Sequence, residues 1–262
     1  MATTTHAPSP NPAPTTSLLE PAPDAKTTGR AETHPIRSAA VTFAIGYAVL
    51  TVVMLGIGFL LTHTLASTVG RWDEHVNEYF ARHRTGTWND ITKFATAAFN
   101  TTPVIVTAAI VAGLLALRHR FREAAFLVTA LVLEITVFLP VTFAVARDRP
   151  AVPRMNSTPA TSSFPSGHTA AATVLFVGIA LIVTCCTRNR ILRLATSLLG
   201  AVVATLVGFG RVYRGLHHPT DVIVGALFGL ACLAVAAIAV RAYGRASAAK
   251  GSRDLANTPK VN

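Results

Sequence analysis

The stretch AAFLVTALVLEITVFLPVTFAV, residues 124–145, decides the kind of fold that this chain adopts. It contains one charged residue, Glu134, and it matches the roughly 20 residues that an α-helix needs to cross the hydrocarbon core of a membrane. In lipid such a stretch has to be helical, because its backbone N–H and C=O groups find no water and must bond within the segment. We therefore predict a membrane-spanning helix here.

Five further apolar runs accompany this one and predict an all-α, polytopic membrane protein with six transmembrane helices. The predicted spans cover residues 39–64, 103–117, 124–145, 168–186, 191–209 and 220–240. The composition agrees, because hydrophobic residues make up 51% of the 262-residue chain and charged residues only 13%. With a mean hydropathy of +0.48, the chain does not have the composition of a soluble globular protein.

The formal net charge of +11 raises the question of a nucleic-acid partner. The basic residues fall between the apolar runs and in the tails, without the basic stripe and interleaved aromatics of a nucleic-acid-binding face. The lipid bilayer, with its anionic headgroups, and a phosphorylated substrate are therefore the expected partners. Cys185, Cys186 and Cys232 match no metal-ligand or redox spacing and are predicted to be small hydrophobic residues of the spans.

Arginine-rich connections predict how the helices are oriented. The loops RHRFRE, residues 118–123, and TRNRILR, residues 187–193, are expected in the cytoplasm by the positive-inside rule. Residues 1–37, rich in Pro, Thr and Ala, are predicted to form a disordered cytoplasmic tail, and residues 242–262 a disordered basic one. The membrane domain between them is predicted to span residues 38–241.

Three segments then lie outside the predicted plasma membrane, residues 65–102, 146–167 and 210–219. In the first of them, residues 71–100 mix aromatic with charged side chains, as one or two interfacial amphipathic helices do. We expect this segment to cover the side from which a lipid reaches the site.

Polar side chains are concentrated in the other two outer segments. They occur in ARDRP, residues 146–150, in FPSGHT, residues 164–169, and in GRVYRGLHHPTD, residues 210–221. Because spans three to six alternate in direction, the ends of spans three and five and the starts of spans four and six meet at one membrane face. The residues predicted to gather there are Arg147, Arg149, Ser166, Gly167, His168, Arg211, His217 and Asp221.

This set of side chains suits chemistry on a phosphate group. Guanidinium groups bind phosphate oxygens two at a time, and the free N–H groups at a helix start also favour an anion. One histidine can attack phosphorus as a neutral imidazole while the other protonates the departing oxygen. Asp221, four residues after His217, is predicted to accept a hydrogen bond from the Nδ1–H of that ring. Each residue alone has an ordinary explanation, such as a snorkelling arginine, but the conjunction indicates a phosphate site.

The chain resembles the type 2 phosphatidic acid phosphatase (PAP2) family, also called the lipid phosphate phosphatases, which shares its active site with vanadium haloperoxidases. The family's second motif, Pro-Ser-Gly-His, is intact at residues 165–168. Its third motif, Ser-Arg, five residues, His, three residues, Asp, is matched by Arg211, His217 and Asp221, with Gly210 in place of the Ser. Its first motif, Lys, six residues, Arg-Pro, ends here in Arg149 and has Thr142 in place of the Lys.

The resemblance covers about residues 142–225 and implies a role for each matched residue. It implies that His217 is the nucleophile that forms a phosphohistidine, that Asp221 orients it, and that His168 is the general acid. It implies that the phosphate is held by Arg149, Arg211, Ser166 and Gly167. It implies no metal or other cofactor. Because Thr142 removes a positive charge, we expect Arg147 to take over part of the lysine's role.

A phosphate site level with the headgroups suits a lipid whose tail stays in the bilayer. Undecaprenyl diphosphate and phosphatidic acid are the two leading substrates, and the sequence does not separate them. A phosphotransferase with the same site, a haloperoxidase and a non-catalytic membrane transporter remain as alternatives. Glu134 is a functional candidate because acidic residues inside spans are costly, although a carboxyl bonded to a neighbouring helix explains it equally well. The oligomeric state stays open.

Overall fold

The computed structural model describes residues 34–157 and 161–256, and every regular element in them is helical. The long helices of the bundle are α1, Pro35–Phe59, α4, Thr101–Leu117, α5, Phe121–Val145, α8, Arg190–Tyr213, and α9, Pro219–Ala256. A further span consists of α6, Gly167–Ala172, η3, Thr173–Val177, and α7, Gly178–Cys186, in succession. Shorter elements join α1 to α4, namely η1, Leu60–Thr64, η2, Ala66–Gly70, α2, Arg71–Arg82, and α3, Gly86–Ala98.

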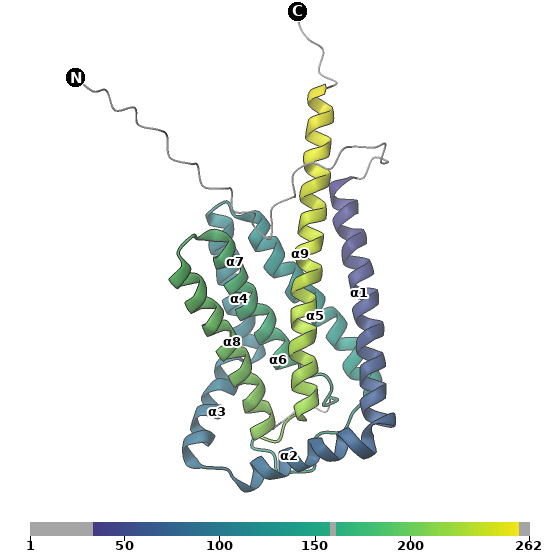
Figure 1. Cartoon of the computed structure of the whole chain (residues 1–262), viewed down its shortest axis with the longest axis vertical. Coiled ribbons are helices and arrows are strands. Elements are labelled where there is room, and N and C mark those ends of the chain that lie inside the picture. Colours follow the sequence, from purple (N-terminus) through teal and green to yellow (C-terminus); the bar gives the residue numbers. More distant parts are fainter. Residues whose placement is uncertain (1–33, 158–160, 257–262) are drawn as a thin grey trace, which may run out of the picture.

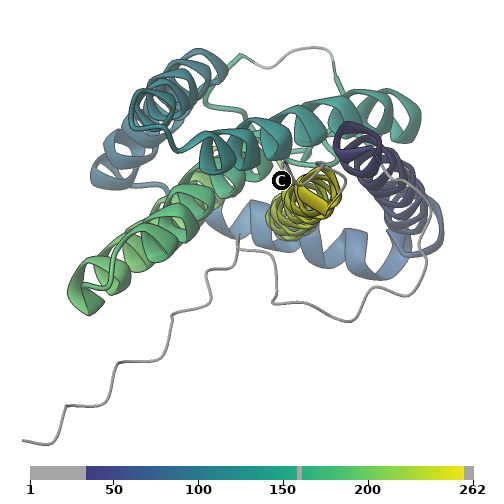
Figure 2. The ribbon, with the colours of Figure 1, turned by 90° about the horizontal axis from the view of Figure 1, so that it is seen from above.

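Helix α9 runs the length of the bundle and packs between α1 and α5 (Figure 1). Helix α2 lies crosswise at the lower end of the bundle, beneath the end where α9 begins. The view along the bundle shows α2 crossing behind α9, with α1 on one side of α9 and α8 on the other (Figure 2). The prediction of an amphipathic segment after the first span is thus met by two helices, α2 and α3.

The predicted all-α membrane fold is confirmed. In residues 34–157 and 161–256, five helical segments are long and apolar enough to cross a membrane, and a sixth is added if α3 and α4, bent by 53° at their junction, count as one span. The second predicted span, residues 103–117, was the shortest because it corresponds to α4 alone, and the preceding helix α3 is bent away from α4 and contains polar residues. Large apolar side chains such as Ile45, Val52 and Ile105 point outward, as side chains that face lipid do.

The described helices extend beyond two of the predicted domain boundaries. Helix α1 begins at Pro35, and proline is well tolerated in the first turn of a helix. Helix α9 continues through residues 242–256, so the predicted disorder of the C-terminal tail is wrong for that part. The alanine-rich sequence RASAAK, residues 245–250, favours helix once α9 has been started by the apolar span. Residues 1–33 and 257–262, which carry the rest of the predicted tails, lie outside the described residues.

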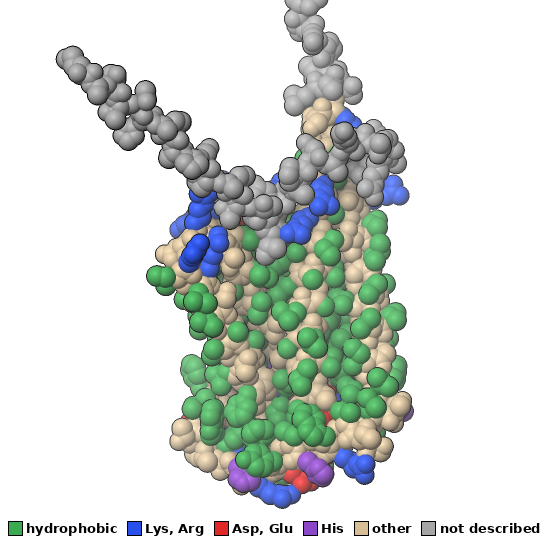
Figure 3. Space-filling view, in the orientation of Figure 1, with side chains coloured by type: hydrophobic (Ala, Val, Ile, Leu, Met, Phe, Trp, Pro, Cys, Tyr) green, Lys and Arg blue, Asp and Glu red, His purple; other side chains and the backbone are tan. Residues whose placement is uncertain are grey.

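Side chains sort by type along the bundle on the face that Figure 3 shows. Apolar side chains cover the middle, Lys and Arg gather at the upper end, and His, Arg and acidic side chains lie at the lower end. The upper end holds the two arginine-rich loops and the C-terminal part of α9. The two loops predicted to be cytoplasmic thus lie at the same end of the bundle, and that this end faces the cytoplasm stays a prediction of the positive-inside rule.

Two glycines of α9 let the helix that begins at Gly167 lie directly against it. A Cβ at Gly225 would be 2.7 Å from the backbone oxygen of Ser166, and one at Gly229 would be 2.8 Å from that of Ala170. Any larger residue at either position would push the two backbones apart. This close approach places the start of α6 beside the start of α9, and so brings the two polar segments of the sequence together.

Candidate active site

His217 lies in the turn between α8 and α9 and is 4% exposed. Its Nδ1 is 2.6 Å from the backbone oxygen of Ser163. A carbonyl only accepts hydrogen bonds, so Nδ1 carries the ring proton and Nε2 keeps its lone pair. Burial, together with the positive charges of Arg211 and Arg149, holds the pKa of His217 well below its usual value of 6.5. The ring is therefore a neutral imidazole with a free nitrogen.

The turn around His217 is held from below by α2. The side-chain amide of Asn77 donates to the backbone oxygens of His217, at 3.2 Å, and of Val212, at 3.3 Å. Asn77 is 1% exposed, so these bonds lie in the protein interior. Sequence reasoning missed Asn77, although it lies one turn after Asp73 on the same face of an amphipathic helix.

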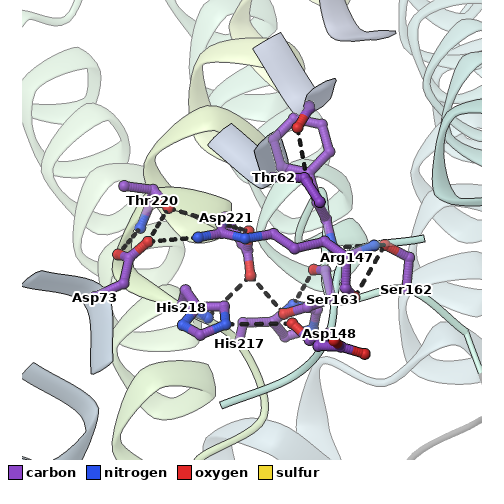
Figure 4. Close-up of polar contacts among 12 residues, drawn as sticks. Thr62, Asp73, Arg147, Asp148, Ser162, Ser163, His217, His218, Thr220 and Asp221 are labelled. Carbon is purple, nitrogen blue, oxygen red and sulfur yellow. Dashed lines mark hydrogen bonds and ion pairs between the residues drawn. The ribbon is translucent and has the colours of Figure 1, made fainter. Parts of the chain in front are cut away.

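Asp221, at the start of α9, does not bind the ring of His217. Its Oδ2 accepts hydrogen bonds from the hydroxyl of Ser163, at 2.5 Å, and from the backbone N–H of His218, at 2.9 Å (Figure 4). Its Oδ1 accepts from Arg147. Among the described residues no hydrogen bond joins the Asp221 carboxylate to the ring, so the predicted direct bond is wrong. Ser163 links the two instead, because its hydroxyl binds the carboxylate while its carbonyl holds the ring.

Arg147 is bound between two carboxylates. Its Nη2 is 2.7 Å from Oδ2 of Asp73, and its Nη1 lies 2.5 Å from Oδ1 of Asp221 and 2.9 Å from the hydroxyl of Thr220 (Figure 4). Asp73 and Asp221 are fully buried and Arg147 is 7% exposed. We call Arg147, Asp73, Thr220 and Asp221 the Arg147 network. The expectation that Arg147 takes over part of the missing lysine's role is contradicted, because its guanidinium is bound to these two carboxylates and does not line the cavity that holds His217.

A cavity of about 510 Å³ opens on the other side of His217. At its polar end it brings together residues from the end of α8, from the turn that follows α8, from the loop before α6 and from the first turn of α6. Of the predicted site residues, it is lined by Arg149, Gly167, His168, Arg211 and His217. From there it continues between α4 and α5 as an apolar groove, along side chains such as Val104, Ile105 and Phe138.

Two arginines of this polar end have very different bonding. Arg149 donates from Nη1 to the backbone oxygen of Leu216 at 2.6 Å, which ties it to the turn of His217. Arg211 is 6% exposed, and its guanidinium makes no hydrogen bond or ion pair with any residue in the described parts of the chain. A buried charge without a partner is costly, and an anion in the cavity would supply the partner.

The surroundings of Arg149 also show where positive charge is concentrated. Its pKa is lowered by burial and further by the charge of Arg154, while Asp221 acts in the opposite direction. Arg154 is exposed in the loop between α5 and α6. It was not singled out in the sequence, and it adds a third positive charge near Arg149.

His168 faces the cavity from the first turn of α6. Its Nε2 is 2.8 Å from the side-chain oxygen of Asn100, at the junction of α3 and α4. Asn100 therefore orients the second histidine from a segment about 70 residues earlier in the chain. Nothing in the sequence around Asn100 pointed to this contact.

Two residues of the family motifs do not reach the cavity. Ser166 is fully buried, its backbone N–H donates to the carbonyl of Asp221 at 3.1 Å, and its hydroxyl is 2.9 Å from that of Thr169. The predicted contact of Ser166 with phosphate is therefore not formed by its side chain or amide. Thr142 is buried within the bundle, without a hydrogen-bond partner among the described residues, and it does not line the cavity.

Comparisons with known proteins agree with this arrangement. Residues 123–245 match the sequence model of the PAP2 superfamily. No match was found among curated protein sequences. The crystal structure described as the first transmembrane PAP2 type phosphatidylglycerolphosphate phosphatase, from Bacillus subtilis, is similar to this chain with a TM-score of 0.53 and 18% sequence identity. The similarity covers 87% of this chain and all of that one.

The family predicted from the motifs is thereby confirmed, and so is the membrane fold. The matched residues, 123–245, contain every residue predicted for the site. The family match supports a membrane phosphatase, and the structural likeness, at 18% identity, supports the fold.

Proposed function

We propose that this chain, which carries a PAP2 superfamily domain over residues 123–245, is an integral-membrane lipid phosphate phosphatase that works through a phosphohistidine. The observation that carries the proposal is the buried guanidinium of Arg211, which has no partner in residues 34–157 and 161–256. It lines the same cavity as His217, whose Nδ1 is bound and whose Nε2 is free. A buried cation beside a neutral nucleophile suits an anionic electrophile, and phosphate is the common one.

The first chemical step transfers the phosphoryl group to the enzyme. Nε2 of His217 attacks phosphorus and the bond from phosphorus to the lipid oxygen breaks. His168, held as an imidazolium by the negative charge of the bound phosphate, donates its proton to that oxygen as it leaves. The terminal nitrogens of Arg149 and Arg211 bind the other phosphate oxygens, whose charge grows in the transition state. The backbone carbonyl of Ser163 stabilises the positive charge that His217 acquires at Nδ1–H.

The second step releases inorganic phosphate. Water attacks phosphorus, His168 now accepts the proton of that water, and the bond from phosphorus to Nε2 of His217 breaks. Both histidines return to their starting protonation states, so the cycle balances. An acceptor alcohol in place of water would make the same site a phosphotransferase, which is the second candidate function. A non-catalytic transporter has no use for the bound and oriented histidines.

The apolar part of the cavity supports a lipid substrate. The groove between α4 and α5 begins at the two arginines and is lined mainly by aliphatic and aromatic side chains. A tail in this groove and a phosphate at the arginines fit one amphiphilic molecule. Undecaprenyl diphosphate and phosphatidic acid both meet this description, as does phosphatidylglycerolphosphate, which the name of the similar Bacillus subtilis enzyme gives as its substrate.

The position of the site supports catalysis at the outer face of the plasma membrane. The turn between α8 and α9, which contains His217, lies at the end of the bundle opposite to the two arginine-rich loops (Figure 1). By the positive-inside rule those loops are cytoplasmic, which places the histidines outside. Substrates whose phosphate is presented on the outer leaflet are then favoured.

Release of inorganic phosphate from a panel of lipid phosphates tests the proposal. The full chain in detergent is expected to hydrolyse at least one of the three lipids, and His217→Ala to hydrolyse none. Brief incubation with substrate labelled in the phosphate should leave an acid-labile, base-stable label on the wild type and none on the variant. Equal phosphate release by wild type and His217→Ala would overturn the proposal, and transfer of label to an added alcohol would favour the phosphotransferase.

A further inference from the structure

Glu134 is a buried acid in the wall of the lipid groove. Its side chain is 5% exposed, and it is the one acidic residue that lines the cavity within the described parts of the chain. The side chains around it, such as Leu131, Ile135 and Phe138, are apolar. The phosphate chemistry proposed above makes no use of it.

The carboxyl group of Glu134 has no partner in the described parts of the chain. Among residues 34–157 and 161–256, it forms no hydrogen bond or ion pair. The alternative predicted from the sequence, a carboxyl bonded to a neighbouring helix, is therefore not met. Polar groups inside a membrane protein are usually paired, because burying them alone is costly.

The neutral, protonated form of Glu134 suits its position in the wall of the lipid groove. A carboxylate would need a cation, and the arginines of the cavity lie at its other end, on the loop before α6 and at the end of α8. A protonated carboxyl brings an O–H donor and a carbonyl acceptor into the groove. The missing partner is then a hydrogen-bond acceptor on the molecule that fills the groove.

The depth of Glu134 matches one part of a glycerolipid. Phe138 packs against the start of α6, since a Cβ at Gly167 would be 2.8 Å from its ring. Glu134 lies four residues earlier on α5, about 6 Å further from the phosphate end. In a diacylglycerol phosphate, five or six bonds separate phosphorus from the ester carbonyl carbons, a span of about 7 Å. A phosphate at Arg211 therefore brings the ester carbonyls to the level of Glu134.

We propose that Glu134 is a specificity residue, which donates a hydrogen bond to an acyl ester carbonyl and so selects glycerolipid phosphates over polyprenyl phosphates. This inference rests on the proposed function and names its substrate class. A polyprenyl tail has no acceptor at this depth, so it leaves the carboxyl unpaired when it displaces water from the groove. Sites built around a buried polar group discriminate strongly against a ligand that lacks its partner.

A matched pair of substrates isolates the ester group. Dioleoyl phosphatidic acid and its ether-linked analogue, with two alkyl chains of the same length, share the phosphate, the glycerol and the tail, and differ in the two carbonyls. For the wild type, we expect kcat/KM to be at least about tenfold higher with the ester lipid than with the ether lipid. A ratio near one for the wild type would overturn the inference without any variant.

Two variants of Glu134 and one control complete the experiment. Glu134→Leu is expected to bring the ester-to-ether ratio close to one, while Glu134→Gln, which keeps a donor of the same size, should retain most of it. Glu123→Gln, which removes a carboxylate of α5 that pairs with Arg120 instead, should keep the wild-type ratio. An unchanged ratio in Glu134→Leu would overturn the inference. A wild type that hydrolyses undecaprenyl diphosphate but neither phosphatidic acid would also overturn the inference. A wild type that hydrolyses none of the three lipids named above would overturn the proposed function itself, so the two failures are distinguishable.

Discussion

Arg147 and Arg149 are two residues apart in the chain, but their guanidinium groups have opposite surroundings. Arg147 lies between the carboxylates of Asp73 and Asp221, with both terminal nitrogens bound. Arg149 points to the cavity, where its charged neighbour on the facing helix is Arg211, and Arg211 has no partner among the described residues. Both regions are buried. In one region two carboxylates bind a single arginine, and in the other no carboxylate of the described residues forms an ion pair with either arginine.

This difference separates structural from functional charge. A buried arginine between two acids is needed for the stability of the fold. If one partner is removed, the remaining charges stay buried in a low-dielectric interior without a counter-charge. Buried arginines without acids destabilise the empty protein, and evolution retains such arrangements where a ligand supplies the counter-charge. The comparison predicts opposite consequences for the same substitution in the two regions.

The largest expected effect is on catalysis, in Arg211→Met. Removing this guanidinium takes away a charged group that is available only to the substrate, so kcat/KM should fall by about 10²- to 10³-fold. The melting temperature in detergent should stay the same or rise, because an unpaired buried charge is lost. A melting temperature several degrees below that of the wild type would show that Arg211 has a structural partner after all.

The next effect is on stability, in Arg147→Met. This substitution leaves Asp73 and Asp221 buried without their cation, which should cost about 3 to 5 kcal/mol of unfolding free energy. Thermal unfolding in detergent measures the loss. The double variant Arg147→Met with Asp73→Leu should recover part of the stability, because it also removes one of the stranded carboxylates. Additive losses in the double variant would show that the two residues do not form a pair.

A smaller effect is expected at the link between the two regions, in Ser163→Ala. The hydroxyl of Ser163 binds Asp221 of the Arg147 network, and its carbonyl binds the ring of His217 in the cavity. Without the hydroxyl the carbonyl is less firmly placed, and we expect kcat to fall about tenfold with little change in KM, since one hydrogen bond to a charged group is lost. A change confined to KM would indicate that Ser163 acts on the substrate instead.

The smallest expected effect is a shift of the acid limb of the pH profile of kcat/KM toward lower pH. Because burial and the two cavity arginines lower the pKa of His217, the imidazole stays neutral below pH 6.5, and activity is lost only as pH falls through the lowered pKa. The acid limb of kcat/KM that belongs to the enzyme should therefore lie below pH 6.5. Comparing two substrates whose phosphate groups have different pKa values identifies it, because a limb set by the substrate moves and a limb set by His217 does not.

The same shift has a consequence for stability. A histidine whose pKa is lowered in the folded state binds its proton more readily when the chain is unfolded, so the unfolded state gains in stability as pH falls below 6.5. Unfolding free energy should therefore decrease with falling pH in that range. A variant with His217→Gln should show a weaker decrease.

Much of the fold was predictable because membrane spans are local features of the sequence. The stretch from 124 to 145 and its counterparts are apolar over the length of a bilayer, and lipid leaves helix as the available backbone structure. The extension of α9 past residue 241 was missed because its residues are polar, and polarity was taken as a sign of disorder. Helix propensity and the preceding span decide the structure there.

The candidate site was predictable in its membership and less so in its bonding. Arg149, Gly167, His168, Arg211 and His217 line one cavity, as alternating helices and the spacing of the motifs predicted. Asn77 and Asn100 were missed because each is bound to the site from more than 65 residues away in the chain. Four residues of spacing also suggested a bond from Asp221 to His217, but a hydroxyl and a backbone N–H occupy the oxygen in question.

The sequence by itself determined that the chain is a helical membrane protein and which residues gather at one end of it, because hydrophobic length and helix direction are set by local composition. The tertiary structure alone decided which charges meet. Arg147 and Arg149 look alike in the sequence, and their different roles depend on whether α2 brings an acid to the guanidinium. Electrostatic energy falls off with distance and depends on burial, and both are properties of the packed helices.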